Sequence, residues 1–238
     1  MHKYLFVILI IASLFSCEKD LTSQQLLEKT IAYHDPNNLW NSFNSDFHVT
    51  METPDSQNRE SDITINIPES AFYMKAVRET TMIEYKIKGN NCNIALNGNS
   101  HFTEEEAKAN NLSCDRANMY KNYYSFLYGL PMKLKDPGTH IANTFERKSF
   151  KGKEYLVLKV TYDEFVGEDI WYVYLNPETY AMEIYQFFKT DVNGNEIETS
   201  GEYILLSGET VINGIKMPKN RAWFYNKDDL YLGTDILK

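Results

Sequence analysis

The sequence predicts a mainly β protein of the α+β class: an open antiparallel half-barrel of about ten or eleven strands wrapped on a central helix. Three observations support this prediction. Many short segments alternate apolar and polar residues, which is the period of antiparallel strands with one face in water. The connections between these segments are too short for parallel crossovers. One aromatic-rich segment in the middle of the chain has the spacing of a helix.

The central helix is expected within residues 115–134, DRANMYKNYYSFLYGLPMKL. Asp115 suits the N-cap, because a carboxylate there can accept from the free N–H groups of the first turn. Gly129 is expected in the left-handed C′ position, and Pro131 cannot continue a helix. Apolar residues recur at spacings of three and four, which places them on one face; they are Met119, Tyr120, Tyr123, Tyr124 and Leu127. The pattern fits a buried core helix, and it also fits a helix whose tyrosines line a ligand cavity.

Segments that alternate apolar and polar residues, or that are apolar on both faces, predict strands before and after this helix in the chain. They cover residues 47–51, 63–67, 72–76, 83–87 and 92–96 before it, and 156–162, 171–175, 184–188, 203–206, 223–225 and 231–237 after it. Hairpin turns are expected at Asn-Gly pairs such as Asn213-Gly214. Two further helices are predicted by capping boxes, one opening at Thr22 with Gln25 and one opening at Thr103 with Glu106.

The N-terminus has the pattern of an exported and lipidated protein. Leu5–Leu14 is a run of ten apolar or small residues, too short to span a bilayer and typical of a signal-peptide core. Residues 14–17, LFSC, match a lipobox, although Phe15 is a less usual occupant. We therefore expect a signal peptide at 1–16, lipidation of Cys17, and a lipidated tether at 17–22. An ordinary signal peptide with a chance cysteine is the alternative.

Residues 18–20, Glu-Lys-Asp, are similar to a signal that sends some lipoproteins to the outer face of the outer membrane. A charged tether explains them equally well. The expected location is the cell envelope, as an outer membrane lipoprotein on either the periplasmic or the exposed face. The membrane is then a partner through the N-terminal lipid anchor.

Residues 23–238 are expected to form a single half-barrel domain, because they contain no low-complexity linker and no fixed-period repeat. The formal net charge is −9, and removal of Lys3 with the signal peptide makes the remainder one unit more negative. This charge argues against nucleic acid as a partner, since nucleic acid requires a basic footprint. A hydrophobic content of 43% is ample for a sizeable core.

Cys92 and Cys114 are the two cysteines besides Cys17. Export would place them in an oxidising compartment, so we expect a disulfide that ties a strand to the start of the central helix. Two reduced, buried thiols are the alternative. No His or Cys lies at metal-ligand spacing from either one.

No segment predicts a set of catalytic residues. Histidines lack metal-ligand spacing, and adjacent acids such as Asp163-Glu164 are better explained as solvated side chains than as a glycosidase pair. Residues 191–196 resemble a calcium loop, but glycine is misplaced and the distant glutamate is missing, so a hairpin turn explains them better. We therefore predict no catalytic residue, no metal and no cofactor, and a protein that is not an enzyme.

Three motifs carry a resemblance to an uncharacterised family of secreted bacterial lipoproteins. They are YHDP at 33–36 with Trp40, YGLPMKL at 128–134 with DPG at 136–138, and NGIKMPK at 213–219. That family is in turn similar in architecture to the lipoprotein carrier and receptor LolA and LolB. The resemblance implies an open antiparallel half-barrel closed by helices, with an apolar interior. No functional residue of the Lol proteins matches a position here, and a shared fold does not establish a shared function.

Two functions remain from the sequence. The first is a membrane-anchored lipoprotein whose apolar concave face binds a lipid or another hydrophobic ligand, since the largest apolar concavity is the default site. The residues expected to line it come from the central helix and from the strands that carry Trp171 and Trp223, opposite the helix; on the helix they are Tyr120, Tyr123, Tyr124 and Leu127. The alternative is a structural or interaction lipoprotein whose concavity is filled by its own side chains.

Overall fold

The computed structural model describes residues 21–238. The expected signal peptide at 1–16, Cys17 and the tether as far as Asp20 lie outside the described residues. Within the described part of the chain, no helix is both long enough and apolar enough to cross a membrane.

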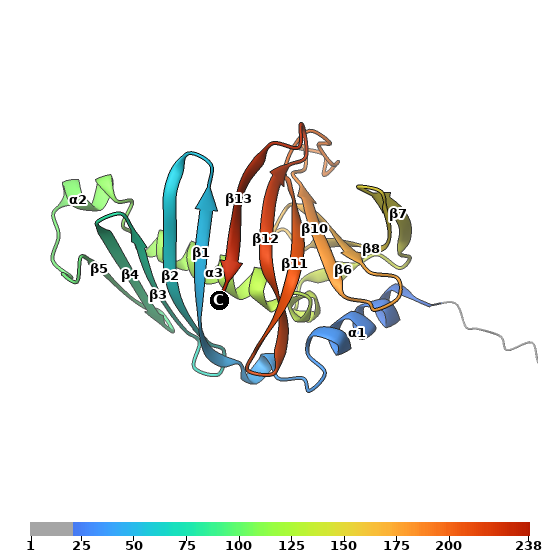
Figure 1. The fold of residues 1–238 in the computed structure, drawn as a ribbon, viewed down its shortest axis with the longest axis horizontal. Coiled ribbons are helices and arrows are strands. Elements are labelled where there is room, and N and C mark those ends of the chain that lie inside the picture. The colour runs from blue at the N-terminus through green and yellow to red at the C-terminus, as the bar shows by residue number, and fades with distance from the viewer. Residues whose placement is uncertain (1–20) are drawn as a thin grey trace, which may run out of the picture.

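One antiparallel sheet of 13 strands forms most of the fold, in the order β5-β4-β3-β2-β1-β13-β12-β11-β10-β9-β8-β6, with β7 also paired to β8. The order is linear, so the sheet is open, and it curves around a long helix (Figure 1). The mainly β class and the open antiparallel architecture predicted from the sequence are therefore confirmed. The first and last strands of the chain, β1 and β13, pair at the centre of the sheet.

The strands before the long helix are β1 (Asn44–Thr53), β2 (Ser56–Asn66), β3 (Ala71–Arg78), β4 (Thr81–Lys88) and β5 (Asn91–Leu96). Those after it are β6 (Thr139–Ile141), β7 (Glu146–Phe150), β8 (Lys153–Tyr162), β9 (Ile170–Leu175), β10 (Met182–Phe188), β11 (Glu202–Ile212), β12 (Ile215–Tyr225) and β13 (Tyr231–Leu237). The predicted number of ten or eleven was too low. The strands missed are β6 and β7, which are short and carry no buried residue to produce an alternating pattern.

The central helix, α3 (Cys114–Gly129), crosses the concave side of the sheet, and its N-terminal part contacts β4 and β5 (Figure 1). Its N-cap is Ser113 rather than Asp115, since the Ser113 hydroxyl accepts from the Arg116 N–H at 3.0 Å. The prediction for Gly129 was also wrong: this glycine is the last helical residue and does not have a positive φ. Its role is to leave space for the indole of Trp40.

The other helices follow the capping boxes. Helix α1 (Ser23–His34) begins after Thr22, and α2 (Glu104–Ala109) begins after Thr103; both boxes are complete. Two short 3₁₀ helices, η1 (Trp40–Ser42) and η2 (Met132–Lys135), follow α1 and α3. Helix α1 packs near β12, and its buried residues are Ser23, Leu26, Leu27, Thr30, Ile31 and His34.

Cys92 and Cys114 form the predicted disulfide, which joins the edge strand β5 to the first residue of α3. Beyond this link, α3 is held by aromatic contacts with the sheet. Tyr128 stacks on Phe47 of β1 with ring centroids 5.0 Å apart, and Tyr124 stacks on Phe72 of β3 at 6.4 Å. Both tyrosines are buried. This side of the helix is therefore core.

Candidate functional site

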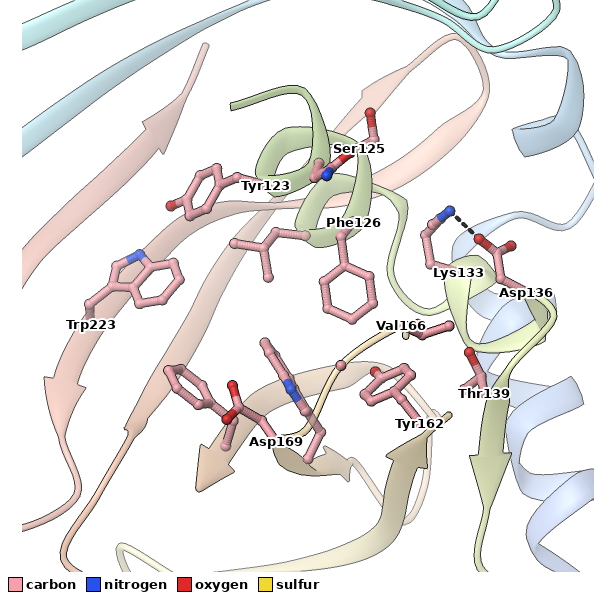
Figure 2. Close-up of a pocket in the computed structure, with 15 residues that line it drawn as sticks. Tyr123, Ser125, Phe126, Lys133, Asp136, Thr139, Tyr162, Val166, Asp169 and Trp223 are labelled. Carbon is pink, nitrogen blue, oxygen red and sulfur yellow. Dashed lines mark hydrogen bonds and ion pairs between the residues drawn. The ribbon is translucent and has the colours of Figure 1, made fainter. Parts of the chain in front are cut away.

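A cavity of about 590 Å³ lies between the C-terminal half of α3 and the inner face of strands β8–β12 (Figure 2). Its apolar wall comes mainly from aromatic side chains on both sides: Tyr123, Phe126, Leu127, Tyr162, Val166, Trp171, Phe187 and Trp223. Polar groups at its border are Asn122, Ser125, Lys133, Asp136, Thr139 and Asp169. Its size falls in the range of about 300–1,000 Å³ that small-molecule sites occupy.

The strand register places the aromatic residues of the sheet on one face. Trp171 of β9 is aligned with Phe187 of β10, and Trp223 of β12 is aligned with Ile204 of β11. Directly aligned residues of neighbouring strands project to the same side. The rings of Trp171 and Phe187 accordingly stack at 5.0 Å. The result is a broad aromatic floor opposite the helix.

The helix supplies the facing wall. Phe126 points from α3 into the cavity (Figure 2) and meets the ring of Trp171 edge-on at 5.2 Å and that of Tyr162 at 6.2 Å. Tyr123 stacks on Trp223 at 6.0 Å. The helix therefore touches the sheet on both sides of the cavity without filling the space between.

Polar groups collect at the border of the cavity. Lys133 and Asp136 form an ion pair at the start and end of η2. Burial raises the pKa of Asp169 above its usual range. The hydroxyl of Tyr162 is buried and has no hydrogen-bond partner among the described residues. Its oxygen has almost no accessible surface, so it is enclosed by protein atoms and does not open onto the cavity.

A second hollow of about 250 Å³ adjoins the first, and Tyr123 and Trp223 line both. Its other lining residues are Met51, Glu202, Leu232, Gly233, Thr234 and Asp235. The hydroxyl of Tyr123 donates to Asp235 Oδ2 at 2.8 Å. Burial raises the pKa of Asp235 and also that of Glu202. The stacked Tyr123–Trp223 pair thus lies between the two hollows and lines both of them.

Four of the six residues expected to line a ligand cavity lie around the first hollow: Tyr123, Leu127, Trp171 and Trp223. The other two, Tyr120 and Tyr124, line neither hollow. Arg59 of β2 donates to the hydroxyls of both. Burial raises the pKa of Tyr124 to about 12, so this hydroxyl stays protonated.

Several residues of the site were not among the sequence candidates. Phe187 lies in a segment that is apolar on both faces, a signal that could have identified it. Arg221 and Asp235 are aligned on β12 and β13 and are 1% and 2% exposed. The guanidinium carbon of Arg221 lies 3.8 Å from the ring centroid of Tyr128, and Nη1 donates to the Pro218 carbonyl at 2.9 Å. The position of Arg221 two residues before Trp223, on the same strand face, was the available signal.

The open antiparallel sheet crossed by one helix is a LolA-like fold. The structure is similar to that of the LolA superfamily protein NE2245 from Nitrosomonas europaea, with a TM-score of 0.51 and 14% identity over 91% of each chain. It is also similar to a DUF1329 family protein from Desulfovibrio piger, with a TM-score of 0.49 and 8% identity over 90% of each chain. At these identities the likeness concerns the fold alone.

Residues 3–237 match the model of a family of unknown function, DUF6503, and the chain belongs to that family. The resemblance to an uncharacterised family with LolA-like architecture is thereby confirmed. No curated protein matches the chain.

Proposed function

We propose that this protein is a membrane-anchored lipoprotein that binds a lipid or another elongated hydrophobic molecule in the cavity between α3 and strands β8–β12. The observation that carries the proposal is the space itself: about 590 Å³ remains beside a helix that packs tightly elsewhere. The space is open to solvent on one side, and an apolar concavity of this size is the default site for a ligand. An apolar ligand would bury its surface against the aromatic walls, at about 25 cal/mol per Å².

The chemistry of the lining residues supports binding rather than catalysis. Most of the surface comes from aromatic and aliphatic side chains. Lys133 is paired with Asp136. The other polar side chains that a ligand would meet are Asn122, Ser125, Thr139 and Asp169. Such a site recognises an apolar body together with one or two hydrogen-bonding groups.

The anchor is the second part of the proposal. A diacylglycerol on Cys17 would hold the domain at the surface of the outer membrane, with only a short segment before α1 begins at Ser23. Each buried CH₂ of an acyl chain contributes about 0.8 kcal/mol, so several chains anchor stably. Metabolic labelling with a fatty acid should mark the wild type and not Cys17→Ala. Labelling and membrane retention of the variant would contradict the anchor.

Native mass spectrometry of residues 21–238 tests the cavity, because it detects retained ligand directly. The matched variant is Ser125→Trp, which puts a large ring into the cavity from α3. Its control is Asn118→Trp, an exposed position on the same helix that lines neither hollow. We expect co-purified or added lipid to bind the wild type and Asn118→Trp, and to be lost from Ser125→Trp with little change in thermal stability.

The opposite outcome is equally clear. If neither co-purified nor added fatty acid binds the wild type, the cavity is not a ligand site. The protein would then be the structural or interaction lipoprotein of the alternative hypothesis.

A further inference from the structure

Two arginines converge on one phenol at the N-terminal end of α3. The hydroxyl oxygen of Tyr120 accepts from Arg59 Nη1 at 3.2 Å and from Arg116 Nη2 at 3.3 Å. The two guanidinium carbons lie 5.4 and 4.9 Å from the Tyr120 ring centroid. Arg59 comes from β2 and Arg116 from the first turn of α3, so helix and sheet each contribute one cation. Both guanidinium groups are cations, so they repel each other.

No carboxylate neutralises these cations directly. Among residues 21–238, every ion pair within 4.0 Å uses lysine or histidine, and none uses arginine. This is unusual in a chain with 33 acidic and 24 basic residues, since acids are available to pair with exposed arginines. The carboxylate of Asp235 lowers the local positive charge but is hydrogen-bonded to Tyr123.

A third arginine lies beside this pair. Arg78 ends β3 and follows Val77, which is aligned with Glu60 of β2, the neighbour of Arg59. Alignment of the two strands therefore brings Arg78 next to Arg59 on the same face of the sheet. The Nε atoms of both arginines are buried without a hydrogen-bond partner among the described residues. These two Nε atoms have almost no accessible surface, so an anion would be bound by the terminal Nη groups, which suit carboxylate and phosphate oxygens.

The basic cluster neighbours residues that line the second hollow. Arg59 is aligned with Met51 of β1, and Met51 is aligned with Asp235 of β13. Met51 and Asp235 both line the second hollow, which shares Tyr123 and Trp223 with the main cavity. Arg116 lies seven residues before Tyr123, about 10 Å along the helix axis. The arginines line neither hollow themselves, and Met51, Tyr123 and Asp235 are the residues that lie between them and the second hollow.

We propose that Arg59 and Arg116, with Arg78 beside them, bind the anionic headgroup of an amphiphile, a carboxylate or a phosphate, whose apolar body occupies the aromatic cavity. This inference rests on the proposed function and adds the class of ligand to it. The anion would accept from two guanidinium groups that are otherwise held together against their mutual repulsion. The Tyr123–Trp223 pair would contact the chain between the headgroup and the cavity.

Calorimetric titration with dodecyl phosphate, dodecanoate and dodecanol, below their aggregation concentrations, tests the assignment. The three probes share one chain and differ in headgroup. We expect both anions to bind residues 21–238 about tenfold or more tightly than the alcohol, the factor that a charged hydrogen-bond pair contributes. Comparison of phosphate with carboxylate shows which of the two anions the cluster prefers.

The variant is Arg116→Gln, which removes one charge from a half-buried helix position and keeps a good helix former. Arg78→Gln is a second variant on the sheet. The matched control is Arg147→Gln, an exposed arginine on β7. We expect Arg116→Gln and Arg78→Gln to lower the affinity for both anions about three- to tenfold and to leave the affinity for dodecanol unchanged. Arg147→Gln should change neither affinity.

The results separate this inference from the cavity proposal. The headgroup assignment would be overturned if the wild type bound the anions and the alcohol with equal affinity. It would also be overturned if Arg116→Gln lowered the affinity for all three probes equally. Either result would leave the cavity proposal in place. Failure of all three probes to bind the wild type would overturn both.

Discussion

The indole of Trp40 occupies the space that a side chain at Gly129 would need. A Cβ at Gly129 would lie 2.8 Å from Trp40 Cε2 and closer still to Cζ2. Trp40 is held there from the other side by Asp35, whose two carboxylate oxygens accept from the backbone N–H groups of Leu39 and Trp40 at 2.7 and 2.8 Å. The segment after α1 is thus clamped against the end of α3.

Gly129→Ala should therefore destabilise the protein, although alanine is the better helix former by about 1 kcal/mol. The new methyl group would have to displace a buried indole, and overpacking of this kind costs about 1–3 kcal/mol. Chemical unfolding would measure the loss. Gly167→Ala is the control, since its Cβ would approach nothing closer than Tyr162 at 3.8 Å. Unchanged stability of Gly129→Ala would show that Trp40 moves aside without cost.

His34 makes a second clamp in the same region. Its Nε2 accepts from the Met182 N–H at 3.0 Å, which leaves Nδ1–H to donate to the Lys216 carbonyl at 2.8 Å. Only the neutral ring can make both bonds. The ring links the end of α1 to β10 and β12. The three motifs of the family resemblance thus meet at these two clamps, through His34, Trp40, Gly129 and Lys216, and their role here is structural.

The His34 clamp should make stability depend on pH. Burial lowers the pKa of His34, an effect larger than that of its hydrogen bond to the Lys216 carbonyl. Between this lowered value and about 6.5, the unfolded chain binds more protons than the folded one. The contribution of His34 is therefore complete above about pH 6.5 and is lost as the pH falls toward the folded pKa.

Urea unfolding between pH 5 and 8 checks this. His34→Leu should cost about 1–3 kcal/mol at pH 8, because the Met182 N–H loses its acceptor. The difference from wild type should shrink as the pH falls. His101→Gln, which removes an exposed ring whose nitrogens make no hydrogen bond within residues 21–238, should parallel the wild type at every pH. A His34→Leu difference that stays constant with pH would contradict the prediction.

The disulfide should hold the edge of the sheet to the helix. Cys92 and Cys114 are 22 residues apart, and closure of such a loop contributes about 3 kcal/mol in the chain-entropy model. The double variant Cys92→Ser with Cys114→Ser should lose about that much stability, and reductant should lower the stability of the wild type alone. Peptide mapping without reductant should recover residues 92 and 114 joined. Two free thiols in protein taken from the periplasm would be evidence against it.

Periodicity predicted most of the elements but not their partners. It identified the eleven longer strands and the helical face of Tyr120, Tyr123, Tyr124 and Leu127, because burial repeats every two or about 3.6 residues. It could not show that Arg59, which is distant in the sequence, donates hydrogen bonds to the hydroxyls of Tyr120 and Tyr124. Nor could it show that Tyr123 stacks on Trp223. Which strand faces which turn of a helix depends on the order and curvature of the sheet.

Leu127→Ala distinguishes a ligand site from a filled core. Leu127 is 3% exposed and lines the cavity, so its truncation enlarges a space that its neighbours already leave open. We expect only a modest loss of stability if the cavity is a ligand site, whereas in a filled core the same change would cost about 2–5 kcal/mol. Bound lipid at a hundredfold excess over Kd contributes about 2.7 kcal/mol of stability. A change at the cavity wall should alter that lipid-dependent gain in Leu127→Ala.

Leu158→Ala is the matched control for Leu127→Ala. Leu158 is 1% exposed in β8 and lines neither hollow. Its truncation opens a space in the packed core and should cost about 2–5 kcal/mol. The lipid-dependent shift in thermal unfolding should nevertheless equal that of the wild type. A shift that is absent in the wild type, in Leu127→Ala and in Leu158→Ala alike would mean that the cavity holds no lipid, because a ligand that binds only the folded state must stabilise it.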